Sequence, residues 1–447
     1  MPVAKQQSSK TPTMGSRSGS SRSGSSRSGN SPSALVVGAG PAGVAAAITL
    51  VDRGVSTTMI DKAEFPRDKC CGDGLTTLAL RELELLGLDP ASVANWSDID
   101  EAWLRSPSGR EVRLPLPSTG LFAAVAPRRD LDSALVDLAR SRGVQVLEGV
   151  AFSGLSEDRH GVHLTAARDG SKIELDATWL VAADGMWSPV RKSLGLTPSN
   201  YLGEWHAFRQ YASNVTGTAR DRLIVWFEED LLPGYAWSFP LPGGRVNIGF
   251  GVLRDGSRRI QDMAEVWRHF LDRPHIRISL GEGAVLEDRH TAWPIPARID
   301  SATTGTGRVL FAGDAVMACD TLTGEGIGQA LLSGRLAGEA IASNQGSTNE
   351  DVRSIRDSYR KSIRHHLVAD HRMSRALSRV LSHSRGARGA IAVVAHSGTW
   401  GRTHFARWMF EDEPRAIVLT PRRWHRTLLR SPGTYRPSAT FESCALD

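Results

Sequence analysis

The residues ALVVGAGPAGVAAAITLVDR (34–53), followed by TTMID (57–61), decide the fold of this chain. The four apolar residues at the start predict a buried strand. An apolar helix is expected to follow the glycine-rich turn and to run to about Arg53. TTMID predicts a second strand that ends at Asp61. This order of strand, turn, helix and strand is typical of the opening of a dinucleotide-binding α/β fold of the Rossmann type.

The turn has the spacing Gly-x-Gly-x-x-Gly, formed by Gly38, Gly40 and Gly43, with Ala42 just before the last glycine. The first glycine allows the sharp bend, the second lets a pyrophosphate approach the backbone, and the third lets the helix pack on the strand. The helix N-terminus then favours the phosphate charge. Asp61 stands where a carboxylate can accept hydrogen bonds from ribose hydroxyls. We therefore expect these residues to bind a dinucleotide, whose identity the motif leaves open.

The composition is typical of a folded enzyme. Of the 447 residues, 40% are hydrophobic and 23% are charged, which argues against disordered, collagen-like and membrane-spanning classes. No stretch approaches the ~20 apolar residues of a spanning helix, and no secretory signal is present. The cysteines are too few and too irregularly spaced for a disulfide framework or a zinc site, which predicts a reducing, cytoplasmic compartment and no metal. They are Cys70, Cys71, Cys319 and Cys444.

The formal charge of +6 is unevenly distributed along the chain. Residues 1–33 carry +5 and residues 351–447 carry +10, so that residues 34–350 carry −9. Basic flanks on an acidic body indicate an anionic neighbour such as a membrane surface or a phosphorylated substrate. The alternative is that these charges only solvate an exposed region. No nucleic acid partner is expected.

Four regions follow from the patterns along the chain. Residues 1–33 are Ser/Arg/Gly repeats and predict a flexible tail. Residues 34–200 and 305–345 predict the dinucleotide-binding domain, which a helix at 128–142 and buried strands at 179–183 and 308–313 complete. Residues 201–304 predict an antiparallel-sheet substrate domain. Residues 346–447 predict a basic helical region. The strands expected in the antiparallel sheet are 205–215, 223–227, 235–241 and 245–253.

Two further segments specify the cofactor. LVAADGMWSPVR (180–191) and RVLFAGDAVMACDTLTGEGIGQALLSGRLAGEAI (308–341) resemble motifs of the FAD-dependent aromatic hydroxylase and geranylgeranyl reductase group. Asp314, at the end of a buried strand, can accept hydrogen bonds from ribityl or ribose hydroxyls. The helix that opens at Gly324 offers free N–H groups to the flavin ring and the pyrophosphate. The resemblance implies bound FAD, with contributions from Arg128, Asp184, Gly185, Asp314, Gly324, Gly326 and Ile327.

FPRDKCCGDGL (65–75) and PGYAWSFP (233–240) resemble the two segments that mark geranylgeranyl reductases. Cys70 and Thr77-Leu78 depart from the usual pattern, which makes the substrate less certain to infer than the cofactor. The resemblance covers roughly residues 34–430 and implies a flavoprotein that saturates carbon–carbon double bonds of polyprenyl chains. The matching positions in the first segment are Pro66, Cys71, Gly72 and Gly74.

The second segment predicts an aromatic wall, because alternate side chains of a strand share one face. Tyr235, Trp237 and Phe239 would form a wall that suits a long apolar isoprenoid. Ordinary core packing is the alternative. By resemblance, Arg209 and Tyr211 are expected at the same pocket.

Cys71 is the candidate catalytic residue. A trisubstituted alkene is unactivated, so a proton must be delivered together with, or before, hydride transfer from the flavin, and a proton donor and a dry pocket are needed. Cys71 would donate that proton or position the alkene, and donation requires a pocket apolar enough to keep the thiol protonated. Asp73 is an alternative acid. Otherwise Cys71 is a small residue packed on the flavin, and the neighbouring Gly72 and Gly74 bind the cofactor by letting the backbone approach its ring closely.

Other functions remain open at this point. A flavin monooxygenase of aromatic or polyketide substrates would use the same framework, and a prenyl-binding escort would use the same aromatic pocket without redox chemistry. A halogenase is disfavoured, because its Trp-x-Trp-x-Ile-Pro signature is absent from the sequence. No second glycine motif follows a strand, so NADPH would dock transiently over the flavin, or another external donor would supply electrons. Menaquinone, geranylgeranyl diphosphate and geranylgeranyl lipids are the candidate substrates. Residues 353–388 with Trp400, Trp408, Phe410 and Trp424 are candidates for contact with an anionic membrane.

Overall fold

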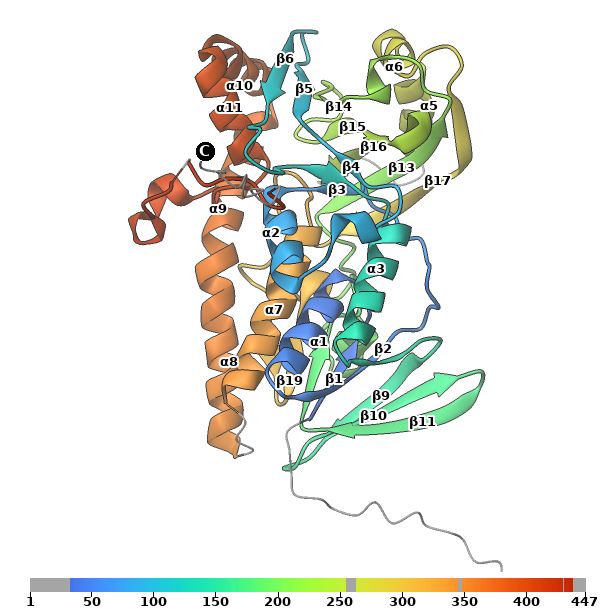
Figure 1. Cartoon of the computed structure of the whole chain (residues 1–447), viewed down its shortest axis with the longest axis vertical. Coiled ribbons are helices and arrows are strands. Elements are labelled where there is room, and N and C mark those ends of the chain that lie inside the picture. Colours follow the sequence, from blue (N-terminus) through green and yellow to red (C-terminus); the bar gives the residue numbers. More distant parts are fainter. Residues whose placement is uncertain (1–32, 255–262, 345–347, 429, 437–447) are drawn as a thin grey trace, which may run out of the picture. The chain divides into compact units, whose positions relative to one another are not determined.

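A six-stranded sheet forms the centre of the larger part of the molecule (Figure 1), and the computed structural model describes residues 33–254, 263–344, 348–428 and 430–436. The expected tail up to residue 32, and Cys444, lie outside the described residues. The strand order is β18-β19-β12-β1-β2-β8, and every pairing except that of β18 is parallel. The strands are β1 (Ser33–Val37), β2 (Ser56–Ile60), β8 (Gln145–Leu147), β12 (Trp179–Ala182), β18 (Gly305–Thr306) and β19 (Val309–Phe311).

Helices α1 and α7 lie side by side against this sheet (Figure 1). The seam between them is made of small residues, since a Cβ added to Gly334 would lie 2.0 Å from the carbonyl oxygen of Ala42. Parallel strands and apolar helices in this order confirm the expected Rossmann-type α/β fold. The helices of this part are α1 (Pro41–Asp52), α2 (Thr77–Leu86), α3 (Arg128–Ser141), α4 (Pro189–Ser193), α7 (Ile327–Ser343) and α8 (Asn349–Ile363).

Two small sheets accompany the central one. The first has the order β11-β10-β9 and shares its core, because Val162, Leu164 and Ala166 belong to the same cluster of buried residues as β1. The second has the order β3-β7-β4. Their strands are β3 (Gly74–Leu75), β4 (Ser97–Asp98), β7 (Ala124–Val125), β9 (Ala151–Glu157), β10 (Val162–Arg168) and β11 (Ser171–Ala177).

A seven-stranded sheet has the order β17-β13-β16-β15-β14-β5-β6. The expected antiparallel meander is present in β14, β15 and β16, but β13 pairs with β16 and β17 rather than with β14. Strands β5, β6 and β17 have no counterpart among the strands expected from the sequence. Helices α5 (Met263–Leu271) and α6 (Pro274–Leu280) belong to this part of the chain. The strands are β5 (Glu101–Arg105), β6 (Glu111–Pro115), β13 (Trp205–Ser213), β14 (Leu223–Trp226), β15 (Tyr235–Leu241), β16 (Arg245–Leu253) and β17 (Val285–Ile295).

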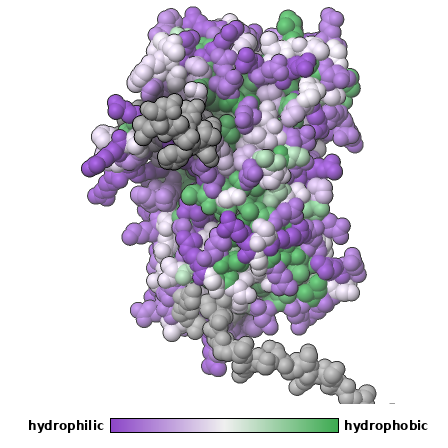
Figure 2. Space-filling model, in the orientation of Figure 1, coloured by the Kyte–Doolittle hydropathy of each residue, from purple (hydrophilic) through white to green (hydrophobic). Residues whose placement is uncertain are grey.

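The C-terminal region continues from α8 through a π-helical turn at Arg364–Val368 into α9 (Ala369–Leu381), α10 (Ser384–His396) and α11 (Gly398–Met409). Helices α10 and α11 contact β6, so this region meets the seven-stranded sheet at its edge (Figure 1). No helix among the described residues is long and apolar enough to cross a membrane. Figure 2 shows a mostly polar face with separate apolar patches.

Candidate functional site

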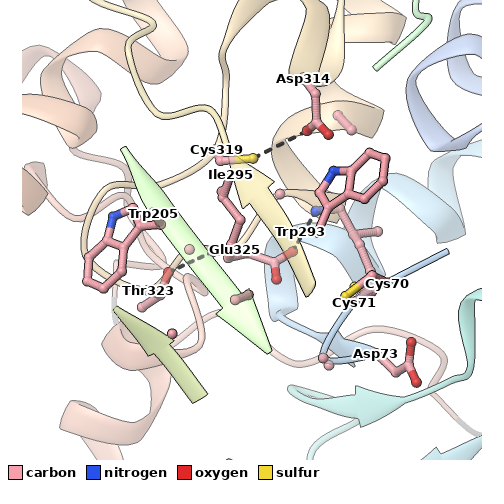
Figure 3. Close-up of a pocket in the computed structure, with 18 of the residues that line it drawn as sticks. Cys70, Cys71, Asp73, Trp205, Trp293, Ile295, Asp314, Cys319, Thr323 and Glu325 are labelled. Atoms are coloured by element: carbon pink, nitrogen blue, oxygen red, sulfur yellow. Dashed lines mark hydrogen bonds between the residues drawn. The ribbon is translucent and has the colours of Figure 1, made fainter. Parts of the chain in front are cut away.

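A cavity of about 980 Å³ connects the glycine turn, the seven-stranded sheet and the C-terminal helices. Its lining includes the ends of β1 and β2, residues of the loop from Asp61 to Thr76, the aromatic residues of β15, the start of α7 and apolar residues of α9, α10 and α11. Figure 3 shows part of this lining, including Cys71, Asp314 and Glu325. Three of the residues predicted for the site do not line this cavity, namely Gly43, Arg209 and Tyr211.

The glycine turn has the conformation that its spacing predicts. Gly38 has φ +102°, and a Cβ there would lie 2.3 Å from the carbonyl oxygen of Ala183. A Cβ on Gly43 would lie 1.8 Å from the carbonyl oxygen of Gly38, which is the close packing of helix on strand expected for the third glycine. Gly43 therefore shapes the turn from behind the cavity.

Two arginines lie over the second glycine. A Cβ added to Gly40 would be 3.7 Å from Nη2 of Arg67 and 3.8 Å from Nη2 of Arg128. Arg128 donates from Nε and Nη2 to the two carboxylate oxygens of Asp132, at 2.7 Å each, and Arg67 Nη1 lies 2.9 Å from the same carboxylate. An open glycine backbone beside two guanidinium groups and a helix N-terminus fits a diphosphate. These residues therefore fit FAD, and Arg67 adds to the predicted set.

The three predicted carboxylates line the cavity but already have protein partners. Asp61 accepts hydrogen bonds from the amides of Ala39 at 2.8 Å and Ala63 at 2.9 Å. Asp184 accepts from Ser188 Oγ and from the amide of Val190, so it also fixes the start of α4. Asp314 pairs with Lys69 at 3.2 Å and accepts from Cys319 Sγ at 3.3 Å. A carboxylate oxygen can accept more than one hydrogen bond, so these three side chains could still bind ribose or ribityl hydroxyls. Those roles stay predictions.

The aromatic wall forms as its alternation predicts. Ring centroids of Tyr235 and Trp237 are 6.0 Å apart, those of Trp237 and Phe239 are 6.1 Å apart, and all three rings line the cavity. The Cys71 loop packs directly on this wall. A Cβ on Gly72 would lie 3.4 Å from Trp237 Cε2, and one on Gly74 would lie 2.9 Å from Phe239 Cε2. These glycines thus let the loop approach the aromatic wall closely, and because both also line the cavity, their contact with the flavin stays a prediction.

Cys71 lines the cavity as a free thiol beside Cys70, and neither forms a disulfide. Burial, followed by the nearby carboxylate of Asp73, raises the pKa of Cys71 to about 12. The thiol is therefore protonated at physiological pH, which is the condition that the sequence analysis set for Cys71 as a donor.

Asp73 is fully buried, with φ +64°, and it organises the underside of the loop. Its Oδ2 accepts from Tyr211 Oη at 2.6 Å and from Asn247 Nδ2 at 2.7 Å, and its Oδ1 accepts from the amide of Arg128 at 3.2 Å. Asn247 also donates to the carbonyl oxygen of Cys71 at 2.8 Å. Asn247 is a polar residue within an apolar run of β16, which marks it as unusual in the sequence but does not reveal its partners.

Arg209 and Tyr211 support the loop from behind the cavity. Arg209 Nη2 contacts both carboxylate oxygens of Asp68, at 2.7 and 2.5 Å, while Tyr211 bonds Asp73. The guanidinium carbons of Arg209 and Arg245 lie 4.5 and 4.2 Å from the centroid of the Tyr211 ring. The cavity lining thus does not include these two residues, which the sequence analysis expected at the substrate pocket.

The start of α7 differs from the expectation in one respect. The amides of Ile327 and Gly328 donate to Oε1 of Glu325 at 2.9 and 3.0 Å, so these N–H groups are capped rather than free. The side chain of Glu325 lines the cavity next to Gly324 and Gly326. Glu325 lies within a segment whose glycines were considered, but its own side chain was not.

The fold and this site define a flavoprotein, and comparison with known proteins agrees. The model of the family described as FAD binding domain matches residues 32–345. The menaquinone reductase of Mycobacterium tuberculosis is 35% identical over 339 residues, which cover 69% of this chain and 76% of that protein. Digeranylgeranylglycerophospholipid reductase 2 of Methanopyrus kandleri is 29% identical over 311 residues, which cover 69% of this chain and 76% of that protein.

A crystal structure of a geranylgeranyl bacteriochlorophyll reductase-like protein from Thermoplasma acidophilum superposes with a TM-score of 0.73 at 21% identity. The match covers 88% of this chain and 99% of that one. The chain belongs to the geranylgeranyl reductase family of FAD-dependent oxidoreductases.

Proposed function

We propose that this enzyme saturates carbon–carbon double bonds of a polyprenyl chain at the expense of reduced FAD. The observation that carries the proposal is the continuity of one cavity, from the glycine turn and its two arginines past Cys71 to an apolar arm under the C-terminal helices. A long apolar chain fits such an arm, because each buried methylene contributes about 0.8 kcal/mol. The residues that line the arm are Leu377, Val380, Leu381, Ala387, Ala390, Ile391, Val394, Phe405, Trp408 and Met409.

FAD would be held by the glycine turn and Asp61, with Arg67 and Arg128 at the diphosphate and Asp314 at the hydroxyls. When bound and reduced, the flavin supplies a hydride. The protein provides a dry cavity, an aromatic wall that orients an apolar chain, and a source of protons. NADPH or another external donor would reduce the flavin.

Cys71 is proposed to contact the alkene, either as proton donor or by positioning it. Its thiol stays neutral and small, so it lies against an apolar chain without burying a charge. Tyr235, Trp237 and Phe239, which line the same cavity, would orient the chain beside this loop.

A menaquinone side chain is the favoured substrate, since mycobacterial relatives at 32% and 35% identity are named menaquinone reductase. Geranylgeranyl diphosphate and geranylgeranyl lipids are the alternatives, and the archaeal relatives support the lipid.

The test is mass spectrometry of isoprenoid quinones and prenyl lipids in cells with and without the gene, repeated with Cys71→Ser. The purified protein should be yellow. In cells without the gene, one lipid class should contain two hydrogens fewer for every reduction that is missing. Cys71→Ser should retain FAD while losing most of the reduction. Unchanged lipids, together with oxygen uptake coupled to an aromatic substrate, would instead identify a monooxygenase.

Peripheral contact with an anionic membrane is also proposed, through the outer surface of α9, α10 and α11. Val380 lines the cavity and is also 56% exposed, so the apolar arm continues to an exposed side chain on α9. Val393 and Trp400 are each 72% exposed on α10 and α11. Of the four aromatic residues expected at a membrane, Phe410 is buried and Trp408 lines the cavity, which leaves Trp400 and Trp424.

A further inference from the structure

One carboxyl group in the cavity has no role so far. Glu325 stands immediately before α7 and lines the cavity (Figure 3). Figure 3 shows its carboxyl group turned toward the side of the cavity that carries Cys71 and Trp293. The sequence analysis placed glycines and a helix N-terminus here but no acid.

The two oxygens of Glu325 have different surroundings. Oε1 accepts from the amides of Ile327 and Gly328 at 2.9 and 3.0 Å. Oε2 has no hydrogen-bond partner among the described residues. Oε1 therefore has the environment of a carbonyl oxygen, and Oε2 is free to carry a hydrogen into the cavity.

The groups around Glu325 favour its protonated form. Glu411 and Asp320 lie close by, and within the described part of the chain no cation pairs with Glu325. Arg415 is engaged by the other two acids, with Nε 3.4 Å from Asp320 and Nη2 3.2 Å from Glu411. Three carboxyl groups beside one guanidinium leave a surplus of negative charge, which a bound proton relieves. The other titratable groups that interact with Glu325 are Cys71, Tyr235 and Cys319.

Other acids in the cavity are poorer proton sources. Both oxygens of Asp73 accept hydrogen bonds from N–H or O–H donors, which stabilises the carboxylate form. Cys71 is protonated but its pKa is raised to about 12, so it is a weak acid.

We propose that Glu325 is the acid that protonates the alkene in the reductase reaction. The inference rests on the proposed function. Saturation of one double bond adds one hydride, with its two electrons, and one proton. The π bond of the alkene breaks as its electron pair takes the proton, and reduced FAD, when bound, would supply the hydride to the other carbon. The Oε2–H bond of Glu325 breaks, a C–H bond forms at the alkene, and the resulting carboxylate takes up a proton from water before the next cycle. Cys71 is then left to position the alkene.

The decisive variant is Glu325→Gln, which retains an acceptor for the two amides of α7 but has no acidic proton. We expect unchanged FAD content and unchanged flavin reduction, with kcat for alkene saturation lowered by about 100-fold or more. Glu339→Gln on α7, whose carboxylate pairs with Arg335 and Arg53 at the surface, is the matched control and should retain full activity.

A second measurement needs no turnover. The infrared difference spectrum between the wild type and Glu325→Gln at neutral pH should contain the carbonyl band of a protonated carboxylic acid, and the difference spectrum between the wild type and Glu339→Gln should lack it. Burial and the nearby Glu411 raise the pKa of Glu325 to about 8, so the band and kcat should both decline as pH rises through that value. Glu411→Gln should shift both declines to lower pH.

The outcomes separate this inference from the proposed function. If the wild-type enzyme reduces no prenyl substrate, the proposed function fails. If the wild type reduces one and Glu325→Gln does so at the same rate, or if the difference spectrum between the two contains no such band, Glu325 is not the acid and Cys71 regains that role.

Discussion

At the scale of single residues, Asp73 shows how a buried charge holds the site together. Its carboxylate receives hydrogen bonds from Tyr211, Asn247 and the amide of Arg128, which joins the Cys71 loop to β13, β16 and the start of α3. Each such bond to a charged group contributes about 1.5–3 kcal/mol against the cost of desolvation. Burial nevertheless outweighs these bonds and raises the pKa of Asp73 to about 6, and the carboxylate still predominates at neutral pH.

This raised pKa predicts a pH-dependent stability. The unfolded carboxyl titrates near 3.8 and the folded one near 6, so between these values the native state binds the additional proton. The stabilisation is therefore complete below about pH 4 and is lost as pH rises through about 6. Unfolding in urea should show the loss, on the order of 2–3 kcal/mol, in the wild type and not in Asp73→Asn. Asparagine also tolerates the positive φ of this position, so the substitution adds no backbone strain.

Asp169→Asn is the matched control for this measurement. Asp169 also has a positive φ, but it is exposed in the turn between β10 and β11. It should leave the pH dependence of the wild type intact. The same pH dependence in Asp73→Asn as in the wild type would show that the Asp73 carboxylate does not cause the effect.

Residue-scale prediction worked where a motif encodes a local backbone shape. Gly38 and Gly43 stand within one short turn, and their spacing alone fixes the contacts they allow. Glu411 and Asn247 belong to the site only because distant elements meet there. Asn247 reaches the loop at Cys71 across 176 positions, and no local pattern encodes that contact.

At the scale of elements, the seam between α1 and α7 decides how the cofactor turn is held. Gly334 packs on the carbonyl oxygen of Ala42, a residue that also lines the cavity. A Cβ added to Gly338 would lie 2.9 Å from the carbonyl oxygen of Ala46. Close helix contact of this kind leaves no room for a side chain. Because Gly334 and Gly338 have no side chains, α7 can approach α1 closely enough to support the backbone of α1 at the cavity.

Gly334→Ala should therefore destabilise the enzyme even though alanine favours helices. We expect overpacking to cost about 1–3 kcal/mol, or more, against a helix-propensity gain of about 1 kcal/mol. Thermal unfolding should occur at a lower temperature, and FAD should be retained less well. Gly389→Ala on α10 has nothing within 4 Å of its added Cβ, so it should be neutral or stabilising. Equal effects of the two substitutions would mean that the seam tolerates a side chain.

The elements that sequence analysis missed lack a strong pattern. β17 carries Glu287, Asp288 and Arg289 and is largely exposed, because it is an edge strand that pairs only with β13. β5 and β6 have only five residues each, and their alternating burial arises only when β5 pairs with β14 and β6 with β5. The parallel strands β1, β12 and β19 of the six-stranded sheet were predictable, since burial on both faces demands continuous apolar runs.

At the scale of the whole molecule, the cavity runs from the cofactor turn to the exposed side chains of the C-terminal helices. A polyprenyl lipid is nearly insoluble in water, so an enzyme that takes it up gains from placing its opening against a bilayer. The region from residue 351 onward carries a charge of +10, which favours an anionic surface by about 1 kcal/mol for each basic residue near it. Charge and exposed apolar side chains thus coincide on one region of the chain.

The enzyme should consequently sediment with vesicles that contain anionic lipid, and should do so less as salt screens the charges. Val393→Ser combined with Trp400→Ser should weaken binding, because these two exposed side chains would enter the interface. Ile278→Ser removes an equally exposed apolar side chain on α6 and should leave binding unchanged. Reduction of a substrate presented in vesicles should fall with the double variant while reduction of a short, detergent-dispersed substrate persists. Equal loss of vesicle binding in the α6 variant would mean that the contact is not made by the C-terminal helices, and substrate would then have to enter the cavity from elsewhere.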